Sequence, residues 1–242
     1  MVKPVRCGVI DVQAARTMKL RTLAELQLGG IVGTRWTPTG PVSISLVDYV
    51  SNPNEYRRYS ALLRGVPLLG KTPAARSIVW AWSCTAVVAK GSDVSTAIAF
   101  ESNSIEGLRL YKDLLSSDSA ILLDESELHD RSQYPFMSVS IAKLFLDPSS
   151  AATLRARKHN VFLPANTPRL FTANSPSFAH WCGMEDAAPD NVHLTALCKR
   201  CYDFQIVAPL FAAGSQSSWT APEFPEERAT AARIGELWRA SR

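Results

Sequence analysis

The sequence predicts an α/β fold with three layers, in which helices cover both faces of a mostly parallel sheet of about five strands. Three observations lead to this prediction. From about residue 42 onward, short apolar runs alternate with helical stretches, which is typical of parallel strands joined by helices. The composition, with 46% apolar and 20% charged residues, is that of an ordinary folded domain. No apolar run is long enough to span a membrane as a helix.

The expected elements alternate along the chain. The expected strands are residues 60–63, 96–100, 119–123, 169–172 and 203–207, and the expected helices are residues 72–90, 105–115 and 192–201. The strands are short apolar runs, and the helices show apolar residues at helical spacing. Two further helices are expected outside this region, at residues 16–28 and 226–240.

The chain divides into three parts by this pattern. Residues 1–45 form an N-terminal extension with a weak signal, residues 46–207 form the core, and residues 208–242 form a C-terminal helical tail. The first boundary is placed near Thr37-Pro38-Thr39-Gly40-Pro41, because this stretch is typical of a loop.

Charge and cysteine usage restrict the partners and the compartment. The formal net charge of +4 permits a nucleic-acid partner without requiring one. Five cysteines at irregular spacing argue against a disulfide framework and favour a reducing compartment. The first thirty residues contain no continuous apolar segment, so we expect a cytoplasmic or nuclear protein with no membrane partner. Import into an organelle is the second interpretation of this basic N-terminal segment.

The segment Gly65-Val66-Pro67-Leu68-Leu69-Gly70-Lys71-Thr72 fits the phosphate-loop pattern G-x-x-x-x-G-K-[ST]. It follows an expected strand and opens an expected helix, as this motif requires. Backbone N–H groups between Gly65 and Gly70 would wrap the phosphates at the helix N-terminus. Lys71 would neutralise the β- and γ-phosphates of ATP, and the Thr72 hydroxyl would ligate Mg²⁺.

An apolar run that ends in two acids, Ala120-Ile121-Leu122-Leu123-Asp124-Glu125, predicts a second part of the site. In P-loop NTPases such a strand lies beside the phosphate-loop strand. Asp124 would then support the magnesium ion through water, and Glu125 would take a proton from the attacking water.

Two further segments carry polar residues at the ends of expected elements. Asn174 follows the strand at residues 169–172 and would orient the attacking water or contact the γ-phosphate. Arg200, with Lys199 as the second choice, follows a helix and precedes a strand. It would act as an arginine finger on the nucleotide of a neighbouring subunit, although a cation also suits a helix C-terminus.

With these four segments in this order, the chain resembles an AAA+-type ATPase, and most of all the superfamily-three helicases of viral and plasmid replication initiators. Residues 65–72 match the Walker A motif, residues 122–125 match Walker B, and residues 171–174 match motif C, also called sensor 1. Arg200 lies where the arginine finger of the family falls. The resemblance covers roughly residues 55–207 and implies a P-loop NTPase that hydrolyses ATP with Mg²⁺.

The resemblance also implies partners. Subunits of this family form homo-oligomeric rings, usually hexamers, that pull single-stranded nucleic acid through the centre. A loop between Walker B and motif C carries the basic contacts, and here that interval contains Arg155, Arg157 and Lys158. Basic side chains of this kind bind the phosphates of single-stranded DNA or RNA. No origin-binding or nicking motif precedes residue 60, so the chain resembles an ATPase core alone.

Two other functions remain open from the sequence. One is a non-catalytic module that binds nucleotide or partners, because Pro67, Leu68 and Leu69 are bulkier than the small residues common in phosphate loops. The other is a P-loop small-molecule kinase, which the Asp124-Glu125 pair disfavours. A zinc site at Cys198 and Cys201 is a weaker hypothesis, since a single C-x-x-C has no matched second pair.

Overall fold

The computed structural model describes residues 7–9, 30–92, 96–188 and 190–210. The expected helices at residues 16–28 and 226–240 therefore lie outside the described residues. No helix in the described part of the chain is long and apolar enough to cross a membrane.

The fold is α/β, with a mixed, mostly parallel sheet flanked by helices. The strands among the described residues are β1 (Cys7–Val9), β2 (Val32–Thr37), β3 (Gly40–Ser45), β4 (Ser60–Arg64), β5 (Ala99–Ser102), β6 (Ala120–Leu123), β7 (Ala152–Leu154), β8 (Val161–Leu163), β9 (Arg169–Ala173) and β10 (Cys201–Gln205). Eight of them form the main sheet in the order β1-β5-β6-β9-β4-β10-β2-β3, and β7 pairs only with β8.

Five parallel strands, β5, β6, β9, β4 and β10, form the centre of the main sheet. This part agrees with the expected sheet of about five strands. Antiparallel strands extend it, with β1 beside β5 and the hairpin of β2 and β3 beside β10. Residues 38 and 39 form the turn of this hairpin, so the loop expected near residues 37–41 lies inside the sheet.

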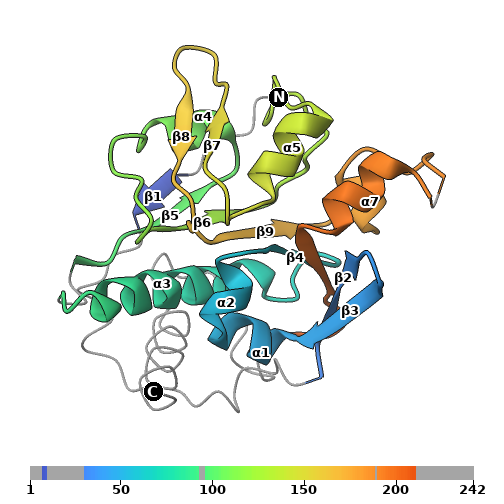
Figure 1. Ribbon diagram of the computed structural model, residues 1–242, viewed down its shortest axis with the longest axis horizontal. Coiled ribbons are helices and arrows are strands. Elements are labelled where there is room, and N and C mark those ends of the chain that lie inside the picture. The colour runs from blue at the N-terminus through green and yellow to red at the C-terminus, as the bar shows by residue number, and fades with distance from the viewer. Residues whose placement is uncertain (1–6, 10–29, 93–95, 189, 211–242) are drawn as a thin grey trace.

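The helices are α1 (Leu46–Ser51), α2 (Pro53–Tyr56), α3 (Lys71–Ala89), α4 (Ile105–Arg109), α5 (Val139–Phe145), α6 (Phe178–Trp181) and α7 (Val192–Cys198). Figure 1 shows α1, α2 and α3 on one side of the sheet, and α4, α5 and the β7–β8 hairpin on the other. The helix expected at residues 105–115 is shorter than predicted, because α4 ends at Arg109 and turns follow it.

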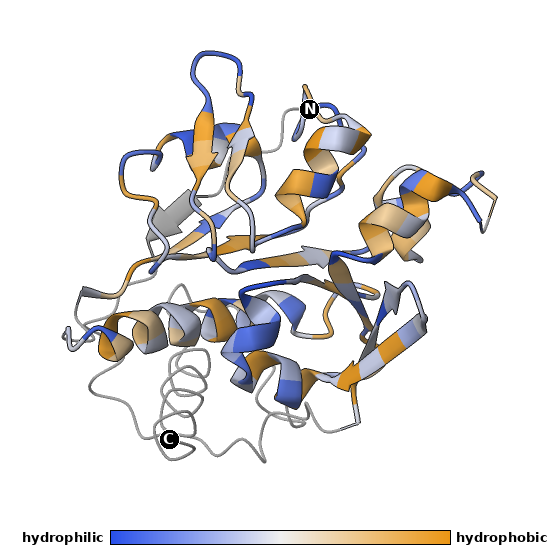
Figure 2. Ribbon diagram, in the orientation of Figure 1, coloured by the Kyte–Doolittle hydropathy of each residue, from blue (hydrophilic) through white to orange (hydrophobic). Residues whose placement is uncertain are grey.

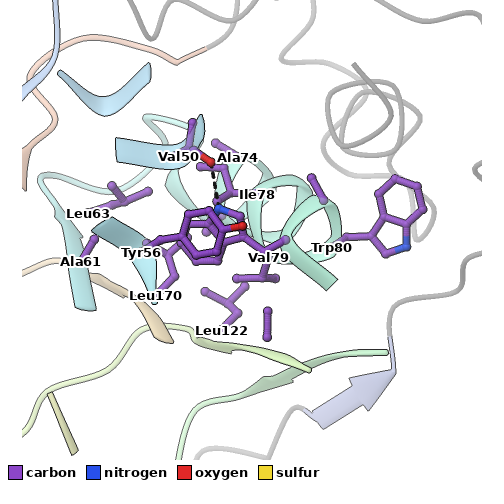
Figure 3. Close-up of a cluster of buried hydrophobic side chains, with 14 of the residues drawn as sticks. Val50, Tyr56, Ala61, Leu63, Ala74, Ile78, Val79, Trp80, Leu122 and Leu170 are labelled. Carbon is purple, nitrogen blue, oxygen red and sulfur yellow. Dashed lines mark hydrogen bonds between the residues drawn. The ribbon is translucent and has the colours of Figure 1, made fainter. Parts of the chain in front are cut away.

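Alternating strand residues supply a hydrophobic core on each side of the sheet, as the two-residue period of a strand requires. In β4, Leu63 packs into the core beneath α3 and Leu62 into the opposite core. The first core, part of which appears in Figure 3, includes Trp82 stacked on Tyr56 with ring centroids 4.7 Å apart. The indole N–H of Trp82 donates to the carbonyl of Val50 at 3.0 Å, so its one polar group is satisfied.

The order of the strands corrects one expectation. The strand that ends at the two acids, β6, was expected directly beside the phosphate-loop strand β4, but β9 lies between them. After β4 the chain forms β5, β6 and β9, which all lie on one side of β4 in the sheet, and β10 then pairs with the other side of β4. The carboxyl end of β4 is therefore a switch point of the sheet, where α/β folds bind ligands.

Candidate nucleotide-binding site

The phosphate loop connects the buried strand β4 to the 19-residue helix α3. Two glycines allow this connection. At Gly65, with φ of 155°, a Cβ atom would lie 2.2 Å from the carbonyl oxygen of Ile206, so any larger residue would force the backbone apart. Gly70, with φ of 79°, precedes the helix in the left-handed region that glycine adopts most easily.

The start of α3 has no side-chain cap and no acidic residue in its first turn. The N–H groups of a helix N-terminus lack partners within the helix, and the helix dipole adds positive potential there. This end of α3 is therefore suited to an anion.

Lys71 is the first residue of α3, and its side chain folds back over the loop. Its ammonium group donates to the carbonyls of Gly65 at 2.8 Å and Val66 at 2.7 Å, and to Asn174 Oδ1 at 3.1 Å. Burial lowers the pKa of Lys71, while the charges of Asp124 and Glu125 act in the opposite direction. The contacts fix a buried cation at the mouth of the loop.

Asp124, immediately after β6, lies against the start of α3. Its Oδ1 accepts hydrogen bonds from the hydroxyls of Thr72 and Thr172, each at 2.6 Å. Thr72 and Asp124 are 52 positions apart in the chain. Oxygen ligands of this kind, one hydroxyl and one carboxylate, fit Mg²⁺, which takes few protein ligands and completes its shell with water and phosphate.

Glu125 follows with φ of 47°, a left-handed conformation that a residue with a side chain seldom adopts. Its N–H donates to Thr172 Oγ1 at 2.9 Å, and its carbonyl accepts from Gln133 Nε2 at 3.0 Å. The Glu125 side chain is exposed and lines the same cleft as Lys71. Strained backbone that is held by several contacts is common at functional sites.

These residues share one cleft of about 400 Å³ at the carboxyl ends of the central strands. The loop, the start of α3, the two acids after β6 and Asn174 after β9 all line it; the lining is Pro67, Leu68, Gly70, Lys71, Thr72, Pro73, Arg76, Asp124, Glu125, Thr172, Ala173 and Asn174. The structure thus brings together the residues predicted to hold phosphate, metal and water.

The bulky residues of the loop leave this cleft open. Leu68 has φ of 68° and is 83% exposed at the rim. Leu69 packs against the core beneath α3, and its carbonyl accepts from the N–H of Leu210 at 2.9 Å. Neither leucine is buried in the space beside Lys71.

Arg200 lies away from the cleft. It directly precedes β10, which runs parallel to β4. Arg200 therefore lies at the amino ends of these strands, and the phosphate loop lies at their carboxyl ends. Its Nη1 donates to the carbonyl of Ala196 at 2.7 Å, and its Nε lies 3.8 Å from Asp147 Oδ2. A function of Arg200 at a phosphate therefore requires the nucleotide of another subunit.

The predicted nucleic-acid residues lie on the β7–β8 hairpin, which projects from the molecule in Figure 1. Figure 2 shows that the tip of this hairpin is hydrophilic. Arg155, Arg157 and Lys158 are exposed there. The guanidinium carbon of Arg155 lies 4.7 Å from the ring centroid of Phe136, and the N–H of Arg157 donates to Glu106.

Sequence reasoning missed three residues of the site. Thr172 lies inside the motif C segment, where only Asn174 was assigned a role, and Gln133 lies inside a turn and belongs to no motif. Arg76 lies one turn along α3 from Thr72, on the same face, and forms a two-pronged ion pair with Glu101 at 2.6 and 2.7 Å. Of the three, only Arg76 had a signal in the sequence, because it lies four residues after Thr72 and therefore on the same face of the expected helix.

The zinc hypothesis finds no ligand set in the described part of the chain. Within the described residues, no group of three or more His, Cys, Asp or Glu side chains is arranged to hold a metal ion. Burial raises the pKa of Cys198 to about 11 and that of Cys201 well above its usual value.

Comparison with known proteins gives no relative: no protein-family model, curated protein or solved structure matches the chain. The interpretation of the cleft therefore rests on its geometry.

Proposed function

We propose that the chain is an ATP-hydrolysing P-loop NTPase, similar to superfamily-three helicases, that acts on single-stranded nucleic acid. The observation that carries this proposal is the convergence in one cleft of motif residues that are far apart in the chain. Lys71 contacts Asn174 at 3.1 Å, and Thr72 contacts Asp124 at 2.6 Å. A chance match to the phosphate-loop pattern would give no reason for these contacts.

The residues then divide the work of phosphoryl transfer to water. The loop N–H groups between Gly65 and Gly70 and the ammonium of Lys71 bind the β- and γ-phosphates. The Thr72 hydroxyl and the Asp124 carboxylate, 2.6 Å apart, would hold Mg²⁺ beside the phosphates. The metal ion, when bound, neutralises charge on the phosphate oxygens.

Glu125 and Asn174 act on the attacking water. The exposed carboxylate of Glu125 takes the proton of this water, and Asn174 orients it toward the γ-phosphorus. The bond between the β,γ-bridging oxygen and phosphorus breaks, and ADP leaves with its charge compensated by Lys71. Arg200 of a neighbouring subunit stabilises charge in the transition state.

Coupling to nucleic acid is supported by the hairpin. Arg155, Arg157 and Lys158 are exposed, and the hairpin that carries them contributes no residue to the lining of the cleft. In a ring of subunits such tips would line a channel and bind successive phosphates of a single strand.

Steady-state ATP hydrolysis of the wild type and of Lys71→Ala, each with and without single-stranded DNA or RNA, tests the proposal. We expect Mg²⁺-dependent hydrolysis by the wild type that rises with one of the nucleic acids. Lys71→Ala removes the phosphate-binding cation, so it should abolish ATP binding measured by calorimetry. Lys90→Ala, which removes an exposed lysine at the far end of α3, is the matched control and should behave as the wild type.

Unchanged nucleotide affinity in Lys71→Ala would contradict the site. Binding of ATP that depends on Lys71, with no turnover under any condition, would instead indicate a non-catalytic nucleotide-binding module.

A further inference from the structure

Thr172 is one of the residues that line the cleft. It lies on β9, the strand between β4 and β6, where it is paired with Leu63 of the phosphate-loop strand. Its neighbour Phe171 is paired with Leu123, the last residue of β6. This register brings the Thr172 side chain, which is 1% exposed, beside the two acids that follow β6.

Three consecutive residues after β6 bind to Thr172. Its hydroxyl donates to Asp124 Oδ1 at 2.6 Å and accepts the N–H of Glu125 at 2.9 Å. Its carbonyl accepts the N–H of Ser126 at 2.8 Å. A hydroxyl is both donor and acceptor, so one oxygen atom connects the carboxylate of the first acid to the backbone of the second.

The first consequence concerns the orientation of Asp124. Two hydroxyls, from Thr72 and Thr172, donate to Oδ1. The other oxygen, Oδ2, makes no hydrogen bond to the residues that the structure describes. The carboxylate is thereby fixed with one oxygen held by protein and the other available in the cleft.

The second consequence concerns Glu125. Its left-handed backbone, with φ of 47°, is strained and persists only where the surroundings hold it. Thr172 holds its N–H, and Gln133 holds its carbonyl at 3.0 Å. The Gln133 side chain also accepts the N–H of Glu127 at 3.0 Å. Its amide group therefore binds both ends of the turn from Glu125 to Glu127.

We propose that Thr172 is a positioning residue that sets the metal-supporting carboxylate of Asp124 and the backbone of the base Glu125 with a single hydroxyl. This inference rests on the proposed ATPase function for its catalytic meaning. It assigns to Thr172 no contact with substrate, because the residue is 1% exposed and its one O–H is donated to Asp124.

The test compares Thr172→Val, which keeps the shape but removes the hydroxyl, with Thr172→Ser, which restores it. Thr167→Val is the matched control, because Thr167 is also fully buried and donates one hydrogen bond, to the carbonyl of Ser116 at 3.2 Å. The first measurement is amide hydrogen exchange of Glu125 in nucleotide-free protein. The second is the affinity for Mn²⁺ in the presence of a non-hydrolysable ATP analogue, and the third is kcat and KM for ATP.

We expect faster exchange at Glu125 in Thr172→Val, and metal affinity lower by about 10- to 100-fold, as for other residues that orient metal ligands. The value of kcat should fall by a similar factor, with a smaller change in KM. Thr172→Ser should recover most of each loss, and Thr167→Val should change none of the three.

Unchanged exchange and unchanged metal affinity in folded Thr172→Val would overturn the inference whatever the activity. Equal losses in Thr167→Val would also overturn it, since they would indicate a general loss of stability. A wild type without Lys71-dependent hydrolysis overturns the proposed function and the catalytic role of Thr172 together. Normal wild-type hydrolysis with unimpaired Thr172→Val overturns the inference alone.

Discussion

Polar side chains in the cleft are hydrogen-bonded to one another, whereas the basic side chains at the tip of the β7–β8 hairpin are exposed. In the cleft, Lys71 bonds to Asn174, and Asp124 accepts from two threonines. At the tip, Arg157 and Lys158 are exposed, and among the described residues neither side chain forms an ion pair.

The difference indicates two kinds of task. Buried polar groups are costly unless they are paired, so the cleft maintains a fixed geometry, as the proposed chemistry would require. Exposed cations remain solvated until a polyanion displaces their counterions. We therefore expect the rate of hydrolysis to depend on single atoms in the cleft. The affinity of the tip for nucleic acid should depend on the total charge there.

Replacing Arg200 should lower kcat more than any other change, because this side chain would act on the nucleotide bound to a neighbouring subunit. Arg200→Ala should lower kcat by roughly 1,000-fold or more, which is the usual contribution of an arginine finger. ATP affinity should stay near the wild-type value. Steady-state hydrolysis measures the change, and Lys199→Ala tests the second candidate at the neighbouring position.

Mixing sharpens this prediction. Arg200→Ala subunits keep an intact cleft, and Lys71→Ala subunits keep an intact Arg200, so their mixture should regain activity that neither has alone. Full activity of Arg200→Ala would remove the finger from the mechanism.

Glu125 gives the next effect, within the cleft itself. Glu125→Gln keeps the size of the side chain but removes the base, so turnover should fall by about 100- to 10,000-fold. Nucleotide affinity should be spared, because the carboxylate faces the attacking water and not the phosphates. Turnover and equilibrium binding are measured in parallel, with Glu127→Gln as the nearby control; normal turnover would show that Glu125 is not the base.

The hairpin gives the smallest effect for each residue. Arg155→Ala, Arg157→Ala and Lys158→Ala combined should weaken binding of single-stranded nucleic acid. The slope of log affinity against log salt should become shallower by about 2, at roughly 0.7 for each lost phosphate contact. ATP binding should not change. Arg58→Ala with Lys90→Ala removes two cations elsewhere on the surface, and an equal effect from this pair would indicate non-specific attraction.

The sequence predicted well those elements whose residues carry both a local pattern and a motif. The strands β4, β6 and β9 and the helix α3 begin and end within two residues of the expected bounds. Their apolar runs are buried on both sides, so the strand signal is continuous. The glycines of the phosphate loop mark the end of one element and the start of the next.

The errors occur where non-local pairing decides the structure. Strand β5 lies at Ala99–Ser102, later than expected, because it pairs with β6 and includes the charged Glu101. The β2–β3 hairpin has partly exposed, polar strands, so its turn gave the signal of a loop. Strand order is not encoded in any local pattern, and the place of β9 between β4 and β6 was therefore invisible.

The same strand order has a consequence for the newly synthesised chain. Strand β4 obtains its two neighbours only from β9 and β10, and the ion pair between Arg64 and Asp203 joins residues 139 positions apart. Such distant pairings make folding slow, because a long loop must close before its contacts form. The ribosome must therefore release residues to at least Gln205 before the phosphate loop has a scaffold. Until then the apolar strand β4 has an unpaired side, and unpaired strands of this kind make a partly folded chain prone to aggregation.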